Sequence, residues 1–94
     1  MKRSLLRFEG YVLRSGRKFE SMCPELDVAS FGKTADAARR ALVEACQIYM
    51  ESAIESNLPY LRPMPAEEHP LRLNLDRIVE RFMVSVEIAI KARA

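Results

Sequence analysis

The chain has 94 residues, of which 49% are apolar and 30% are charged. This length and composition fit one folded domain covering residues 1–94 and exclude a disordered chain. The formal net charge of +2 is too small to indicate nucleic-acid binding by itself. Two cysteines with a single histidine argue against a zinc site, and no run approaches the ~18 apolar residues of a membrane span. We therefore expect a cytoplasmic protein with reduced cysteines, no metal, no cofactor and no membrane partner.

The first third of the chain is predicted to form a hairpin and one further strand. Apolar and polar residues alternate over residues 6–13, and this period of two is typical of a half-buried strand. Residues 15–16, Ser-Gly, supply the turn. A second strand over residues 17–23 ends at Pro24, which has no amide hydrogen to donate to a sheet. Residues 26–31 then predict a short third strand.

One helix is predicted over residues 35–56. The Thr34 hydroxyl can cap its first turn, and Asn57 can end it in the left-handed conformation. Helical periodicity places one side of the helix toward the sheet: Ala38, Ala41, Leu42, Ala45, Ile48, Tyr49 and Ser52. A second stripe flanks this side and consists of Val43, Met50 and Ile54. Either the following loop covers this stripe or it is a subunit interface, and both interpretations stay open.

Four of the five prolines lie in residues 58–74, which predicts a long extended connection before the last strand. Apolar residues at every second position from Phe82 to Ile90 predict that strand. The expected fold is α+β with the order β-β-β-α-β. Its four-stranded mixed sheet carries the helix on one face, and a right-handed crossover returns the last strand parallel to the first. We expect the other face to meet another polypeptide because it carries Tyr11, Leu13, Met22 and Met83.

A short motif in residues 23–52 points to a known family. It begins with Cys-Pro-Glu-Leu at residues 23–26 and continues with Gly32 and Thr34 in a Gly-x-Thr element. The helix that follows carries small residues on one side and Tyr49 toward its end. In order and spacing, the chain resembles the HicB family of antitoxins over residues 6–56, with a final strand in the expected place.

The resemblance implies a shortened ribonuclease H fold and a protein that neutralises a small ribonuclease, HicA, by binding it. Many members of that family continue after the last strand into a DNA-binding segment. Here only Ala-Arg-Ala follows Lys91, which argues against DNA binding.

The ribonuclease H likeness raises the question of catalysis. Such chemistry needs carboxylates that converge on paired metal ions, and Glu9, Glu44 and Glu87 lie on the corresponding elements. Glu44, however, lies about 120° from the centre of the helix side that meets the sheet. Cys46 has no histidine near it in sequence, so a buried and unreactive thiol is the preferred interpretation. We therefore predict that the protein is not an enzyme.

The protein is predicted to be an antitoxin-like binding module that occludes a partner. The candidate partner is a small HicA-type ribonuclease. The module is also expected to form a homo-oligomer. The residues predicted for these contacts are Tyr11, Leu13, Met22, Val43, Met50, Ile54 and Met83. The alternative is a nucleic-acid-binding regulator. In that case a homo-oligomer would combine the basic residues on and near the hairpin, which are Arg7, Arg14, Arg17 and Lys18.

Overall fold

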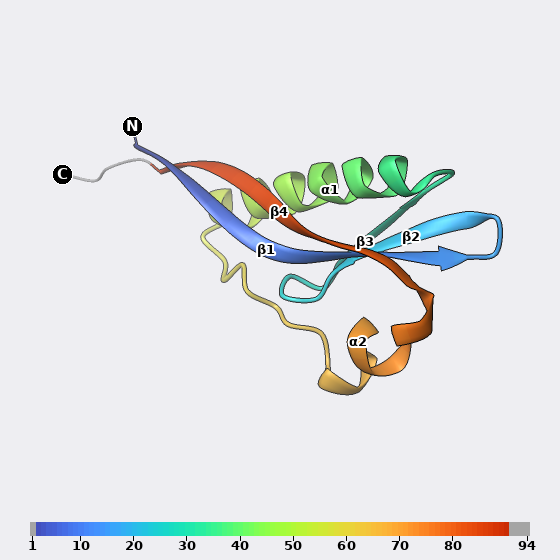
Figure 1. The fold of residues 1–94 in the computed structure, drawn as a ribbon. Helices are drawn as coiled ribbons and strands as arrows, with labels where there is room; N and C mark the ends of the chain where they lie inside the picture. The colour runs from blue at the N-terminus through green and yellow to red at the C-terminus, as the bar shows by residue number, and fades with distance from the viewer. Residues whose placement is uncertain (1, 91–94) are drawn as a thin grey trace.

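The computed structural model describes residues 2–90 and contains one sheet, one long helix and a connection with short helical turns (Figure 1). In chain order the elements are β1 (Lys2–Ser15), β2 (Lys18–Cys23), β3 (Val28–Gly32), α1 (Ala35–Glu55), η1 (Ala66–Glu68), α2 (Pro70–Leu73), η2 (Leu75–Arg77) and β4 (Ile78–Ile90). The order of the strands and of α1 confirms the predicted α+β fold with β-β-β-α-β connectivity.

The direction of the last strand differs from the prediction. The sheet has the order β3-β2-β1-β4, and each neighbouring pair is antiparallel, so the mixed sheet with a parallel last strand was wrong. The connection after α1 carries the chain back along the sheet to the hairpin end (Figure 1). There Ile78 pairs with Leu13, so β4 starts beside the end of β1 and runs against it.

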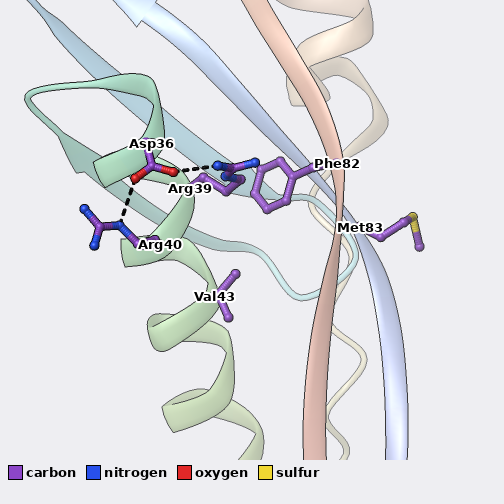
Figure 2. A pocket seen from close by; sticks show the side chains of 6 residues that line it. All are labelled: Asp36, Arg39, Arg40, Val43, Phe82 and Met83. Carbon is purple, nitrogen blue, oxygen red and sulfur yellow. Dashed lines mark hydrogen bonds and ion pairs between the residues drawn. The ribbon is translucent and has the colours of Figure 1, made fainter.

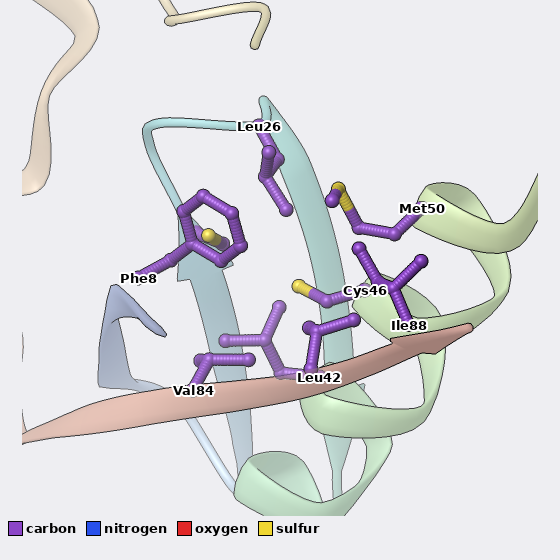
Figure 3. Close-up of a cluster of buried hydrophobic side chains, with 9 residues drawn as sticks. Phe8, Leu26, Leu42, Cys46, Met50, Val84 and Ile88 are labelled. Carbon is purple, nitrogen blue, oxygen red and sulfur yellow. The ribbon is translucent and has the colours of Figure 1, made fainter. Parts of the chain in front are cut away.

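α1 packs on one face of the sheet and closes the core (Figure 3). Its contribution is Leu42, Cys46 and Met50, which follow one another at intervals of four residues and therefore lie on one stripe. Burying a large apolar side chain contributes roughly 1.5–3 kcal/mol, so this stripe holds the helix on the sheet. The buried cluster consists of Phe8, Cys23, Leu26, Leu42, Cys46, Met50, Val84, Val86 and Ile88.

The buried side of α1 is rotated from the predicted one. Ala38 and Leu42 are buried as predicted, but Ile48 is 59% exposed and Ser52 is exposed. Met50 was predicted to lie at an interface or under a loop, yet it is fully buried in the core and offers no surface to a partner. Burying a methionine removes more apolar surface from water than burying an alanine or a serine, so the helix turns its larger side chains inward.

The second face of the sheet is partly covered by the chain's own connection. Figure 1 shows α2 on the side of the sheet away from α1. Tyr11 and Leu13 are fully buried there, and the His69 ring packs edge-on against the Tyr11 ring at a centroid distance of 5.4 Å. The prediction that Tyr11 and Leu13 face a partner was wrong, because both are buried within the chain itself, where α2 and His69 lie on this face.

Arg77 holds the end of this connection against the hairpin. Its guanidinium donates to the carbonyl of Arg14 at 3.0 Å, to Oδ1 of Asn74 at 3.2 Å and to Oε1 of Glu20 at 2.9 Å. The connection was predicted to be extended, but three short helical turns occupy its second half. These turns bring the covering side chains close to the sheet.

The turn between β3 and α1 explains the Gly-x-Thr element. Thr34 is the N-cap of α1, and its Oγ1 accepts a hydrogen bond from the amide of Ala37 at 3.0 Å. A Cβ on Gly32 would lie 2.5 Å from the nitrogen of Ala38, so glycine allows β3 to approach the first helical turn. At the other end Asn57 has φ 56°, which confirms the predicted left-handed residue.

Candidate protein-interaction surfaces

An acidic stripe runs along the side of α1 that faces away from the sheet. Glu44, Ile48, Glu51 and Glu55 are spaced by four, three and four residues, so they lie along one line of the helix, and all four are exposed. Ile48 lies between the carboxylates. Within residues 2–90, none of the three carboxylates takes part in an ion pair. The stripe therefore offers free negative charge around an exposed apolar side chain.

A groove of about 480 Å³ lies between the first half of α1 and β4 (Figure 2). In Figure 2 Phe82 points toward α1, whereas Met83 points away from it. Val43 and Met83, two of the predicted contact residues, both line the groove. The full set of lining residues is Asp36, Arg39, Arg40, Val43, Phe82 and Met83.

The charges at the rim of the groove neutralise one another. Asp36 pairs with Nη2 of Arg39 at 2.5 Å and with Nε of Arg40 at 3.1 Å, while Nη1 of Arg39 reaches Glu80 on β4 at 3.1 Å. The hydrogen bond from Arg39 lowers the pKa of Asp36 below its usual value. Any ligand of the groove would therefore be attracted mainly by its apolar wall.

β4 is an outer strand of the sheet, and the backbone of Glu87 on this strand is bonded to a side chain of α1. The Gln47 side-chain amide donates to the carbonyl of Glu87 at 2.7 Å, and its oxygen accepts from the amide of Glu87 at 3.1 Å. In an antiparallel strand the N–H and C=O of one residue point the same way. Both groups of Glu87 therefore point away from β1, and Gln47 satisfies them.

The glutamates that were weighed as metal ligands do not converge. Glu9 pairs with Arg81 at 2.5 Å and Glu87 pairs with Arg3 at 2.8 Å, both on the sheet face away from α1. The hydrogen bond from Arg81 lowers the pKa of Glu9. Glu44 belongs to the acidic stripe. Across residues 2–90, no group of three or more histidine, cysteine, aspartate or glutamate side chains is placed to hold a metal ion.

Both cysteines lie in the core as free thiols. The neighbouring Cys23 thiol, together with burial, raises the pKa of Cys46. A cysteine nucleophile must be a thiolate, and a raised pKa keeps Cys46 protonated. His69 lies on the opposite face of the sheet against Tyr11, so it cannot serve this thiol as a base.

The structure separates the basic residues predicted for nucleic-acid contacts. Arg14, Arg17 and Lys18 gather at the hairpin end, whereas Arg7 lies in the middle of β1. The Lys18 ammonium lies 5.9 Å from the ring centroid of Phe31, which is 66% exposed. The hairpin end thus combines cations with an exposed aromatic ring.

The predicted contact residues do not form one surface. Met22 and Ile54 are half-buried and lie away from the groove. Sequence reasoning missed Ile48 as an exposed residue because it was counted with the alanine side of the helix. The glutamates at three- and four-residue spacing on either side of Ile48 were a signal that could have identified the outer side.

The architecture defines a class of α+β domain. Its elements follow one another along the chain in the order β-β-β-α-β, and one long helix packs on a four-stranded antiparallel sheet. Among solved structures, the chain is similar to the N-terminal domain of the antitoxin HicB from Burkholderia pseudomallei. The match covers 90% of this chain and 100% of that chain, with a TM-score of 0.58 and 20% sequence identity. The HicB-like fold predicted from the sequence motif is therefore confirmed.

No family model and no curated protein matches the chain. None of the helices within residues 2–90 is long and apolar enough to cross a membrane.

Proposed function

We propose that the chain is an antitoxin-like binding module that neutralises a partner by covering its surface and carries out no reaction itself. The observation that carries this proposal is the likeness to the N-terminal domain of the HicB antitoxin over 90% of the chain. The acidic stripe supports it by offering exposed contact groups, while the side chains considered for catalysis lie apart.

The acidic stripe indicates a basic partner. A ribonuclease binds the phosphate backbone of RNA, so cations surround its active site. Glu44, Glu51 and Glu55 would meet such cations, and Ile48 would form the apolar centre of the contact. An apolar anchor with complementary charges around it is a common arrangement in protein interfaces. The partner that we propose is therefore a small HicA-type ribonuclease in the cytoplasm.

We expect the gene neighbourhood of this chain to encode a small ribonuclease, and the test uses that enzyme. Cleavage of a labelled RNA is measured as purified chain is added, and we expect one equivalent to stop it. Ile48→Arg should weaken inhibition about tenfold or more, because it places a cation opposite the partner's cations. Leu58→Arg is the matched control, since Leu58 is 62% exposed but lies outside the stripe.

Two results would contradict this proposal. A neighbouring ribonuclease that keeps its full activity in excess chain would rule out neutralisation by occlusion. A gene neighbourhood without any small ribonuclease would contradict the proposed partner.

A second candidate function, nucleic-acid binding by a homo-oligomer, is supported by the exposed Phe31 ring beside Lys18. Aromatic rings and cations together bind single strands with little sequence preference. This function predicts that single-stranded RNA binds, that the affinity falls steeply with salt, and that Phe31→Ala abolishes binding. Binding to a protein partner without RNA binding would favour the first function.

A further inference from the structure

The outer edge of β4 presents a row of backbone donors and acceptors. The N–H and C=O of Glu87 face away from β1. Because outward and inward residues alternate along an antiparallel strand, the same groups of Ser85, Met83 and Arg81 also face outward. Within residues 2–90, no side chain or loop forms a hydrogen bond to the outward groups of these three residues. Proline and lysine, which commonly protect outer strands, do not occur among the 13 residues of β4.

Gln47 shows which chemical group this edge accepts. Its side-chain amide donates to the carbonyl of Glu87 at 2.7 Å and accepts from the Glu87 amide at 3.1 Å. A carboxamide carries the same kinds of donor and acceptor as a peptide group, so Gln47 stands where a neighbouring strand would continue the sheet. Since it fills only the position at Glu87, the outward groups of the three preceding outward residues are left for another polypeptide.

An apolar groove and a negative charge lie beside this open edge. The groove of about 480 Å³ is lined by Val43 on α1 and by Phe82 and Met83 on β4 (Figure 2). Glu44 precedes Gln47 by three residues, so the two lie next to each other on the helix surface. Glu44 is exposed and takes part in no ion pair within residues 2–90. A strand added at the edge would therefore place alternate side chains near the groove and near this carboxylate.

We propose that the edge binds an extended segment of a partner protein, which adds to the sheet as a further strand antiparallel to β4. The segment carries a large apolar side chain opposite Phe82, where it enters the groove, and a basic side chain opposite Val84, where it meets Glu44. Antiparallel pairing is the arrangement of each neighbouring pair in this sheet. In this mode of recognition the backbone hydrogen bonds give affinity and the alternate side chains give specificity.

The backbone groups and the charge together select this occupant over others. A helix has free backbone groups only at its ends, so its side cannot satisfy the row along β4. A nucleic acid would bring phosphates toward the carboxylate of Glu44, which repels them. The site goes beyond the proposed function, because any protein with a segment of this chemistry would fit it.

The test uses a short synthetic peptide, acetyl-Lys-Thr-Lys-Val-Leu-Thr-amide. Paired antiparallel to β4, its leucine lies opposite Phe82, its valine opposite Met83 and its second lysine opposite Val84. The peptide is titrated into the full chain labelled with nitrogen-15, and the amide signals of the chain are followed by NMR. We expect a Kd at or below about 1 mM, with shifts of the amide signals of Arg81, Met83 and Ser85.

Two methylated forms of the peptide separate backbone pairing from attraction by charge. Methyl groups on the amide nitrogens of the valine and the first threonine, which face β4 in this register, should weaken binding at least about tenfold. Methyl groups on the amide nitrogens of the two lysines, which face away from β4, should leave the affinity unchanged.

A matched pair of charge reversals tests the contact with the helix. Glu44→Lys should weaken binding of the unmodified peptide about fivefold or more, because it places a cation beside the lysine of the peptide. Glu67→Lys is the control, since Glu67 is an exposed residue of η1 and the net charge changes equally. This variant should bind the peptide like the wild type.

Five results would overturn the proposal. They are no binding at about 1 mM, binding without shifts at Arg81, Met83 and Ser85, equal affinities of the two methylated peptides, equal affinities of the Glu44→Lys and Glu67→Lys variants, and an affinity that falls as the chain concentration rises. The last result would mean that a second copy occupies the edge. Because only the chain and the peptide are used, a failure here is distinct from a failure to neutralise a ribonuclease.

Discussion

Replacing Gly32 with alanine should destabilise the chain, because β3 and the start of α1 leave no space for a side chain. The added Cβ would lie 2.5 Å from the nitrogen of Ala38, 2.8 Å from the carbonyl carbon of Ala37 and 2.9 Å from the Cβ of Ala37. Two of these atoms belong to the backbone, so no rotation of a side chain relieves the overlap. The first turn of α1 would have to move away from the sheet.

The size of the effect follows from these distances. Carbon atoms in ordinary contact are about 3.5–4.0 Å apart, so α1 must shift by about 1 Å. Overpacking of this kind costs about 1–3 kcal/mol. The shift also disturbs the hydrogen bond from Ala37 to Thr34, and a lost N-cap costs about 1 kcal/mol. We therefore expect Gly32→Ala to lower the free energy of unfolding by about 2–4 kcal/mol.

Urea denaturation followed by circular dichroism measures this loss. The control is Gly16→Asn. Gly16 has φ 63°, and a Cβ added to it would meet no atom within 4 Å, while asparagine adopts this conformation readily. We expect this variant to lose less than about 1 kcal/mol. If Gly32→Ala is no less stable than Gly16→Asn, the close approach of β3 to α1 is not a constraint and the reasoning fails.

Three further predictions concern the N-cap, the connection and the core. Thr34→Ala should lower the free energy of unfolding by about 1 kcal/mol. Thr34→Ser should keep most of the wild-type stability, because its hydroxyl can still accept the hydrogen bond from the Ala37 amide. Arg77→Lys should cost about 1–2 kcal/mol in urea denaturation, because an ammonium group cannot reproduce the three directed bonds of the guanidinium. Cys46 should resist iodoacetamide in the folded chain.

Each of these predictions has a result that contradicts it. Equal unfolding midpoints for Thr34→Ala and Thr34→Ser would show that the hydroxyl does not cap α1. A wild-type midpoint for Arg77→Lys would show that the connection is held by other contacts. Rapid labelling of Cys46 in native buffer, detected by peptide mass spectrometry, would show that the core opens on the timescale of the reaction.

The sequence by itself determined the features whose signals are local. Alternating side chains predicted the hairpin, Thr34 predicted the start of α1, and Asn57 predicted its end, and the structure has each of them. The Gly-x-Thr element and the Cys-Pro-Glu-Leu element also predicted the HicB-like fold. Such signals depend on a few neighbouring residues, because capping bonds and backbone conformation are satisfied within one turn.

Only the tertiary structure decided which surfaces are available. The path of residues 58–77 reversed β4 and brought His69 onto the buried Tyr11, and the bond between Gln47 and Glu87 joins residues 40 positions apart. The rotation of α1 likewise depends on which side chains fill the space above the sheet. Local sequence patterns treat an alanine and a methionine as equally apolar. Packing distinguishes them, because the free energy gained depends on the apolar area that the whole fold removes from water.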